Sequence, residues 1–203
     1  MARERLRRIS RRRPAPGRVL EIGCALGFFL SEASRLEYDA LGLDVSEFAV
    51  EHARDVLGQN ARREDFLQAE FTETYDVIAA FYALEHFAEQ KEAFRKIASL
   101  LRPGGIFAFA LPSTHGPLFE RSPERWEETH PVDHFADYSP ASLKKILPLY
   151  GLRLLEARPA SYHPERAGGI WKRLPALYRL YAKFACYGDT MEGIARKDER
   201  TDR

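Results

Sequence analysis

The sequence predicts an α/β fold in which one seven-stranded, mostly parallel sheet carries helices on both faces and the last strand runs antiparallel. Three observations support this fold class. Apolar runs of strand length alternate with helical segments along most of the chain. The connections between them are short, which favours parallel strands with covering helices. The stretch VLEIGCALGFFL, Val19 to Leu30, is typical of a strand that ends in a glycine turn and leads into a helix.

The composition is that of an ordinary soluble domain. The length of 203 residues suits one domain with a sizeable core, and 45% hydrophobic with 30% charged residues is a globular balance. A net charge of +1 selects no partner. The sequence has no apolar run of roughly 18 residues, so we expect no transmembrane helix. The N-terminus also lacks the apolar core of a secretory signal. Only two cysteines occur, Cys24 and Cys186, which argues against a disulfide scaffold and a zinc cluster and favours the cytoplasm.

Residues 1–17 form a basic N-terminal tail or short helix ahead of the domain. The stretch MARERLRRISRRR holds seven arginines in thirteen residues, a composition that can bind nucleic acid or acidic lipid. So short a basic run is a weak motif, and we expect a solvated tail or a short helix before the fold begins. RRRPAPGR marks the boundary with the domain at 18–197, and 198–203 are a polar C-terminal tail.

Strands and helices then alternate in order. Arg18 to Ile22 is a buried strand, and the helix after the glycine turn covers Gly27 to Glu37. Ala40 to Asp44 is the second strand. Ser46 is the expected N-cap of a helix that reaches about Leu57. A short third strand lies near Arg62 to Phe66.

The middle of the chain continues the pattern and then interrupts it. Tyr75 to Tyr82 is an apolar strand, and Ala88 to Leu101 has the apolar spacing of a helix. RPGG ends that helix, and Ile106 to Leu111 is the fifth strand. The segment 112–138 contains four prolines and is too long for a plain connection. It therefore predicts a functional loop or lid over the substrate.

The last third adds two strands. Ser139 to Tyr150 is a helix that is capped by its first residue and has Pro140 at its first helical position. LRLLEARPA is a strand. Gly169 to Tyr187 is a helix rich in aromatic residues. Its stripe suits packing on the sheet or on a second subunit, although it also suits a membrane surface. Thr190 to Lys197 is the final strand, at an edge of the sheet or inserted into it.

The glycine turn favours a ligand other than a dinucleotide. Such a turn points backbone N–H groups at whatever lies above it. A dinucleotide site requires G-x-G-x-x-G, but Ala25 and Phe28 occupy the places of the second and third glycines. The pattern present is acid-x-Gly-x-x-x-Gly, formed by Glu21, Gly23 and Gly27. It suits a ligand without phosphate whose ammonium group binds the carboxylate.

At these residues the chain resembles the class I S-adenosylmethionine-dependent methyltransferases, specifically the small-molecule type called methyltransferase-23-like. The resemblance covers roughly Arg18 to Lys197 and implies a Rossmann-like fold. The family pattern E/D-x-G-x-G-x-G is matched by EIGCALG, with Ala25 in place of the middle glycine. LLRPGG and DYSPASLKKILPLYGLRLLEARP are also similar to family segments. The resemblance implies S-adenosylmethionine as the cofactor and S-adenosylhomocysteine as the product.

The resemblance also implies where the cofactor binds. Asp44, in LGLDVS, matches the acid that binds the ribose hydroxyls. Asp65, in REDFLQ, matches the acid that meets the adenine amino group. FYALEHF lines the methionine part and faces the acceptor. Cys24 is expected to contribute small size and packing. The residues expected at the cofactor are Glu21, Gly23, Cys24, Ala25, Gly27, Phe28, Asp44, Val45, Asp65, Phe66, Phe81 and Tyr82.

Three histidines are the candidate catalytic residues. Methyl transfer from a sulfonium depends on alignment, and a hydroxyl acceptor benefits from a general base. His86 lies just after the fourth strand, where it could equally support the structure or the cofactor. His130 and His134 lie in ETHPVDHF, and an acid between them could orient one. A loop with two histidines and an acid is weak evidence for a metal, so none is expected. The candidate substrate-binding residues are Trp126, Asp133 and Phe135.

The expected function is methyl transfer to a small-molecule acceptor, with a hydroxyl of a sugar, glycan or natural product as the best hypothesis. A nucleic-acid methyltransferase is an alternative that the arginines encourage. The segment after the fourth strand disfavours it, because FYALEHF stands where base methylases have Asn/Asp-Pro-Pro-Tyr. A non-catalytic binding module is a further alternative. Only about 17 residues precede the first strand, so we expect a site that is open, completed by a partner in a homodimer, or suited to a bulky acceptor.

Overall fold

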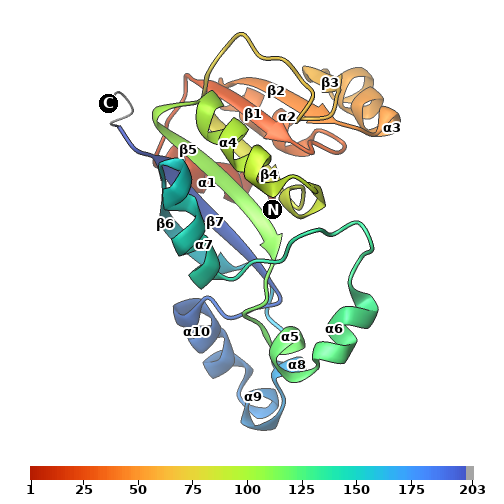
Figure 1. The fold of residues 1–203 in the computed structure, drawn as a ribbon, viewed down its shortest axis with the longest axis vertical. Coiled ribbons are helices and arrows are strands. Elements are labelled where there is room, and N and C mark those ends of the chain that lie inside the picture. Colours follow the sequence, from red (N-terminus) through yellow and green to blue (C-terminus); the bar gives the residue numbers. More distant parts are fainter. Residues whose placement is uncertain (200–203) are drawn as a thin grey trace.

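The computed structural model describes residues 1–199 and confirms the predicted fold class. Seven strands form one sheet in the order β3-β2-β1-β4-β5-β7-β6 (Figure 1). Strand β7 is antiparallel to both of its neighbours, and the other pairings are parallel. The strands are β1 (Arg18–Ile22), β2 (Asp39–Asp44), β3 (Ala61–Arg63), β4 (Tyr75–Phe81), β5 (Leu101–Pro112), β6 (Leu152–Pro159) and β7 (Thr190–Lys197).

Helices cover both faces of the sheet and build an additional lobe at one end (Figure 1). The α-helices are α1 (Ala2–Ser10), α2 (Phe28–Arg35), α3 (Glu47–Glu51), α4 (Gln90–Leu100), α5 (Pro117–Arg121), α6 (Pro123–Thr129), α7 (Pro140–Ile146), α8 (Pro164–Ala167), α9 (Gly169–Arg173) and α10 (Pro175–Ala185). Shorter turns are η1 (His52–Val56), which continues α3, η2 (Leu84–His86) and η3 (Leu147–Tyr150).

Consecutive residues of each strand point to opposite faces of the sheet, so each face has its own hydrophobic core. Val19 of β1 and Val77 of β4 pack with the apolar faces of α1, α2 and α3. Their neighbours Leu20 and Ile78 point to the opposite face and pack with α4 and α7. Because β1, β2 and β4 are buried between these layers, their carboxyl ends are held rigidly, and the chain reverses its strand order there, between β1 and β4.

Two helix starts agree with their predicted caps. The Ser46 hydroxyl accepts a hydrogen bond from the Ala49 N–H at 3.3 Å. Ser139 and Ser142 form a reciprocal capping box, and Pro140 occupies the first helical position of α7. These caps satisfy backbone N–H groups that have no partner within the helix.

The basic N-terminal segment is a short helix, one of the two expected forms, but it packs on the core instead of preceding the fold. Leu6 and Ile9 are buried against the sheet, because residues three apart share one face of a helix. Arg8 donates to Glu192 of β7 at 2.8 Å and to Glu156 of β6 at 2.6 Å. The arginines therefore hold α1 on the antiparallel end of the sheet.

Several other boundaries differ from the sequence expectation. The strand expected at Arg62 to Phe66 ends at Arg63, because the Asp65 carboxylate accepts the N–H groups of Leu67 and Gln68 and turns the chain. The segment 112–138 contains α5 and α6, and each begins with a proline at its first position.

The helix expected over Gly169 to Tyr187 is two helices, α9 and α10. Leu174 separates them in a non-helical conformation, since the ring of Pro175 disfavours helical geometry in the residue before it. Across residues 1–199, none of the helices combines the length and apolarity that a bilayer crossing requires. The last four residues of the expected C-terminal tail, 200–203, lie outside the described residues.

Candidate active site

A cavity of about 640 Å³ opens at the carboxyl ends of β1, β2 and β4. This is the place in a parallel α/β sheet where ligands usually bind, and the volume suits a nucleoside-sized molecule. Most of its lining residues lie at the ends of the four strands β1 to β4 or in the segments that follow them. They are Ile22, Gly23, Ala25, Leu43, Asp44, Val45, Glu64, Asp65, Phe66, Phe81, Tyr82, Ala83, His86, Phe87 and Asp133.

The glycine turn contributes Gly23 and Ala25 to the lining of this cavity, whereas Gly27 does not line it. Gly23 and Gly27 have φ angles of 69° and 80°, in the left-handed region that favours glycine. A Cβ on Gly27 would lie 2.7 Å from the Cβ of Ala53, so the close approach of α2 to η1 depends on this glycine. Ala25 also lies in the left-handed region, at 45°. It adopts the backbone that the family's glycine would adopt, at the cost of local strain.

The carboxylates of Asp44 and Asp65 line the cavity and also accept hydrogen bonds from the backbone of its neighbouring turns. Asp44 accepts the Ala25 N–H through Oδ2 at 2.8 Å and the Ser46 N–H through Oδ1 at 2.9 Å. It thereby joins the glycine turn to the end of β2. Asp65 uses Oδ1 for the turn at Leu67, at 2.7 Å. The two acids are therefore positioned before any ligand arrives, and their roles toward ribose and adenine stay predictions.

Glu21 and Cys24 are buried and do not line the cavity. Glu21 is buried, its Oε2 has no hydrogen-bond partner among residues 1–199, and burial raises its pKa. Burial also raises the pKa of the Cys24 thiol to about 12. The thiol is therefore protonated at neutral pH and packs against Gly42, which agrees with a packing role.

Phe28 lies outside the cavity. Its ring is 59% exposed and sits edge-on to His52 at 6.0 Å. The reason is the start of α2, which turns Phe29 and Leu30 into the core and leaves Phe28 on the outer side. This position does not support the expected contact between Phe28 and the cofactor.

Arg5 is a candidate site residue that the sequence interpretation did not include. Its guanidinium lies 4.2 Å from the centre of the Phe81 ring, and Nε donates to Glu192 at 2.7 Å. Nη2 is buried without a partner among the described residues. The charge of Arg5 lowers the pKa of Glu21, against the larger effect of burial. The spacing of Leu6 and Ile9 was the signal that could have placed this arginine in the fold.

The three predicted histidines converge beside the cavity. The rings of His86 and His134 are 4.7 Å apart, and those of His130 and His134 are 5.2 Å apart. The segment after α6 is brought to η2 by a backbone bond from the Phe135 N–H to the Glu85 carbonyl at 2.8 Å. His86 itself lines the cavity, and the catalytic role of the cluster stays a prediction.

The electrostatics of the cluster are set by burial. Burial lowers the pKa of His134, and the neighbouring His86 and His130 lower it further. Glu85 is 1% exposed, and burial raises its pKa to about 7. Glu85 Oε2 and His134 Nδ1 are buried without hydrogen-bond partners in residues 1–199. At neutral pH, His134 is therefore a neutral ring that is able to accept a proton.

The candidate substrate residues have unequal positions. Asp133 lines the cavity and contacts His86. Trp126 is buried behind His130, with its ring edge-on to Phe119 at 5.5 Å. Phe135 is exposed and does not line the cavity. Asp133 is the member of this set that reaches the cavity, and the substrate-binding roles of Trp126 and Phe135 stay predictions.

Two overlapping groups of side chains have the donor types of a metal site. Glu85, His86 and His134 form one, and His130, His134 and Asp137 form the other, each with donor atoms within 4.8 Å of one another. Two of these imidazole nitrogens already contact carboxylate oxygens. Nδ1 of His86 lies 3.1 Å from an Asp133 oxygen, and Nε2 of His130 lies 2.8 Å from an Asp137 oxygen. The sequence expectation of no metal stays a prediction.

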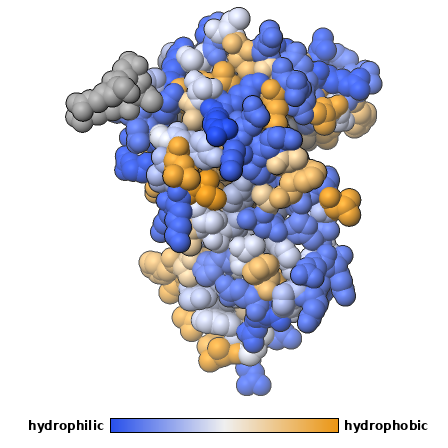
Figure 2. All heavy atoms as spheres, in the orientation of Figure 1, coloured by the Kyte–Doolittle hydropathy of each residue, from blue (hydrophilic) through white to orange (hydrophobic). Residues whose placement is uncertain are grey.

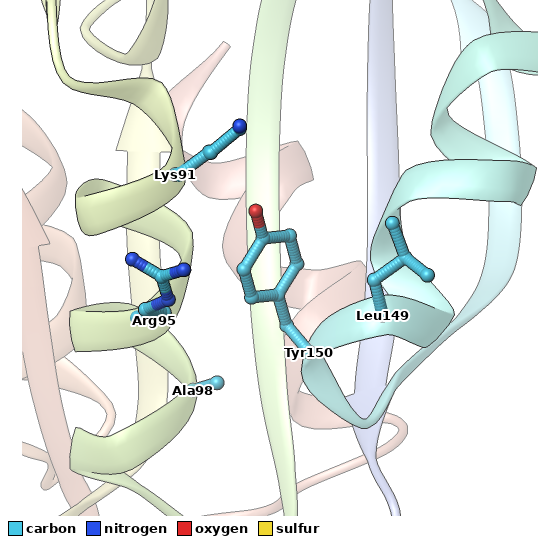
Figure 3. A pocket seen from close by; sticks show the side chains of 5 residues that line it. All are labelled: Lys91, Arg95, Ala98, Leu149 and Tyr150. Atoms are coloured by element: carbon cyan, nitrogen blue, oxygen red, sulfur yellow. The ribbon is translucent and has the colours of Figure 1, made fainter.

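A second hollow, of about 470 Å³, lies between α4 and η3 (Figure 3). Lys91 and Arg95 border it on α4, and Leu149 and Tyr150 border it on η3. It shares no lining residue with the cavity at the strand ends. None of the predicted site residues lines this second hollow, whereas several of them line the larger cavity.

The strand order, the glycine turn after β1 and the acid at the end of β2 define the class I methyltransferase fold. The chain belongs to the methyltransferase domain family, whose model matches residues 1–157. It is an S-adenosylmethionine-dependent methyltransferase, as the sequence resemblance predicts.

Relatives and solved structures agree with this assignment. The ubiquinone biosynthesis O-methyltransferase of Xanthomonas axonopodis pv. citri (strain 306) is 30% identical over 192 residues, or 85% of this chain and 78% of that protein. The same enzyme of Sinorhizobium medicae (strain WSM419) is 32% identical over 106 residues, 49% of this chain and 43% of that protein.

Two solved structures support the fold. The N-methyltransferase NodS from Bradyrhizobium japonicum WM9, in complex with S-adenosylhomocysteine, has a TM-score of 0.66 at 19% identity and covers 97% of this chain and 85% of its own. A SAM-dependent methyltransferase from Archaeoglobus fulgidus has a TM-score of 0.68 at 18% identity and covers 96% of this chain and 92% of its own. At these identities the likeness concerns the fold alone.

Proposed function

We propose that this methyltransferase methylates a hydroxyl group of a small molecule, such as a sugar, a glycan or another natural product. The observation that carries the proposal is the pair formed by His86 and Asp133 at the cavity. Nδ1 of His86 lies 3.1 Å from the Asp133 carboxylate. A histidine oriented by an acid is a suitable general base for a hydroxyl.

The residues divide the work of binding and proton transfer. Asp44 and Asp65 hold the ribose and the adenine, and the glycine turn carries the rest of the aminoacyl nucleoside. When bound, the cofactor supplies a methyl group on a positively charged sulfur. His86 keeps its Nδ1 proton toward Asp133 and accepts the proton of the hydroxyl at Nε2. The ring of His134 lies edge-on to His86, with ring centres 4.7 Å apart, and limits the positions that the His86 ring can adopt.

The acceptor class rests on two kinds of support. The name shared by the relatives, ubiquinone biosynthesis O-methyltransferase, favours oxygen as the methylated atom. It also makes a phenolic hydroxyl a reasonable acceptor beside the sugar hydroxyl that the sequence resemblance suggests. A histidine cluster with a buried, neutral imidazole serves either of them, since both must lose a proton.

Nucleic acid is a poorer acceptor for this chain. Five of the seven arginines that encourage this alternative form ion pairs with acids, whereas Arg7 and Arg11 are exposed. Arg5 pairs with Glu192 at 2.7 Å, and Arg12 pairs with Glu156 at 2.5 Å. Arg13 pairs with Asp76. Side chains already held by carboxylates bind phosphates less readily, which supports a small molecule over a nucleic acid.

The test is a methylation screen of the full chain with S-adenosylmethionine. The panel contains sugars, catechols and other phenols, amines and a mixed RNA, and the readouts are S-adenosylhomocysteine formation and the mass of the product. We expect methylation of a hydroxyl compound, with loss of turnover in His86→Gln. Methylation confined to amines or RNA would contradict the proposal. Cofactor binding without turnover on any compound would favour the non-catalytic alternative.

A further inference from the structure

The outer face of α9 and α10 is apolar, basic and free of acids. Residues 167–188 contain no Asp or Glu. Large apolar side chains on this segment are exposed, with Phe184 at 84%. They are Ile170, Leu174, Leu177, Leu180, Tyr181 and Phe184. The four cations of the segment are exposed beside them: Lys172, Arg173, Arg179 and Lys183.

The exposed apolar residues of α10 form one regular stripe along the helix, separate from the side of the helix that packs in the core. Leu177, Leu180, Tyr181 and Phe184 follow the i, i+3, i+4, i+7 spacing of one helical stripe. A different side of the same helix, at Tyr178, is fully buried and anchors α10 to the lobe. The helix therefore has an inner apolar face that is used and an outer one that is not.

The surrounding lobe holds the two helices firmly. Trp171 of α9 stacks on Tyr181 of α10, with ring centres 5.1 Å apart. Arg166 of α8 pairs with Asp189 at 2.6 Å, and Asp189 also accepts the Leu118 N–H of α5 at 2.8 Å. The outer face is thus presented on a fixed support at the end of the molecule opposite β2 and β3 (Figure 1). Orange, hydrophobic residues appear at this end in Figure 2.

The positive charges beside the stripe favour an anionic bilayer over a second copy of the chain as the partner of this face. On a helical wheel, Arg179 and Lys183 lie next to the apolar stripe of α10, on the side away from Tyr178. A second copy docked by the same face would bring these cations near their own copies, without an acid in 167–188 to pair with them. An anionic bilayer offers acyl chains to the stripe and negative headgroups to the cations.

We propose that the outer face of α9 and α10 docks this enzyme on the surface of an anionic phospholipid bilayer. The helices lie in the plane of the headgroups, with the stripe of α10 toward the acyl chains. The proposal does not depend on the acceptor, because it uses none of the cavity residues. It takes up the membrane-surface alternative of the sequence analysis, because packing on the sheet, the favoured expectation, leaves this face exposed.

Vesicle flotation of the full chain tests the proposal. Vesicles of phosphatidylcholine alone are compared with vesicles of equal parts phosphatidylcholine and phosphatidylglycerol, at low and at high salt. We expect binding to the anionic vesicles at least about tenfold stronger than to the neutral ones, and weakening at high salt because the cations are screened.

Two variants and one control assign the face. Leu177→Ser/Leu180→Ser/Phe184→Ser removes the stripe, and Arg179→Glu/Lys183→Glu reverses the charge. Leu149→Ser is the matched control, since Leu149 is 78% exposed on a different surface. We expect each variant to lower anionic vesicle binding by about tenfold or more and the control to bind normally. All of the changed side chains are exposed, and calorimetry with S-adenosylmethionine verifies that each variant is folded.

Three results would overturn the proposal. One is the absence of binding to anionic vesicles, and another is equal binding to neutral vesicles. The third is vesicle binding that the variants leave unchanged. Concentration-dependent dimers that the stripe variant abolishes, without vesicle binding by the parent protein, would instead identify a second copy of the chain as the occupant.

Discussion

Nδ1 of His86 lies 3.1 Å from the carboxylate of Asp133 and 3.2 Å from the backbone oxygen of the same residue. This contact joins the end of β4 to the segment after α6. Both partners of Nδ1 are acceptors, so a neutral His86 carries its proton there and leaves Nε2 free to accept one. The proposed base is thereby set in a single tautomer by a residue 47 positions away.

Substituting His86 separates proton transfer from cofactor binding. In His86→Gln we expect kcat for a hydroxyl acceptor to fall by about 10²- to 10⁴-fold, with unchanged affinity for S-adenosylmethionine. Asp133→Asn should lower kcat by a smaller factor, since the base remains but its orientation is weakened. His163→Gln is the control, because His163 forms a similar pair with Glu165 at 2.9 Å, outside the cavity. Normal turnover in His86→Gln would remove His86 as the base.

Arg5 provides a second test, at the cofactor end of the site. Its buried Nη2 has no partner among the described residues and is positively charged, so it is suited to the carboxylate of the cofactor's methionine. Arg5→Ala should weaken S-adenosylmethionine binding by about tenfold in calorimetry. Arg8→Ala removes a neighbouring arginine that also pairs with Glu192 and should leave affinity unchanged. Equal losses in both variants would instead indicate a general effect of loosening α1.

Glu85 predicts a specific pH dependence of stability. Burial raises its pKa from 4.5 to about 7. The folded state therefore holds the proton more tightly than the unfolded state, and this stabilisation is present below pH 4.5 and lost as pH rises through about 7. Because glutamine does not ionise, Glu85→Gln does not lose this stability as the pH rises. Relative to the parent, we expect it to gain about 1–3 kcal/mol of unfolding free energy between about pH 5 and about pH 8.

Urea denaturation at several pH values measures the Glu85 effect. Glu89→Gln is the control, since Glu89 is exposed four residues further along the chain. Parallel pH profiles for the parent and Glu85→Gln would show that Glu85 does not titrate differently in the folded state.

Gly27 and Gly58 offer a matched pair for the glycine turn. Both have positive φ, at 80° and 65°, so alanine is strained at either position. At Gly27 the new Cβ would also lie 2.7 Å from the Cβ of Ala53, whereas nothing lies within 4 Å at Gly58. Gly27→Ala should therefore destabilise the protein by about 2 kcal/mol more than Gly58→Ala in urea denaturation. Equal destabilisation would mean that α2 and η1 can separate without loss.

The sequence predicted those parts of the fold and site that depend on local pattern. Asp44 and Asp65 could be found because each stands near the end of a predicted strand, where parallel strands bring side chains to one edge. His86 followed from the same reasoning. His130 and His134 could be nominated by residue type, but their meeting with His86 depends on the backbone bond between Phe135 and Glu85, which no local pattern predicts.

Other features depend on contacts between distant residues. Arg5 was hidden in a basic run, and its partner Glu192 is 187 positions away. The exposure of the α10 stripe was also beyond local reasoning, since an apolar stripe has the same sequence whether it is covered or not. Phe28 was assigned by its place in the motif, whereas the rotation of α2 turns it toward His52.

The most direct test of the account is calorimetric titration of the purified protein with S-adenosylmethionine and S-adenosylhomocysteine, repeated on Asp44→Ala. We predict micromolar binding of both ligands that is lost in Asp44→Ala. Glu47→Ala, which removes an exposed acid at the start of α3, should bind normally. Binding retained in Asp44→Ala would contradict the assignment of this carboxylate. The absence of binding to the folded parent protein would contradict the assignment of the cavity as the cofactor site.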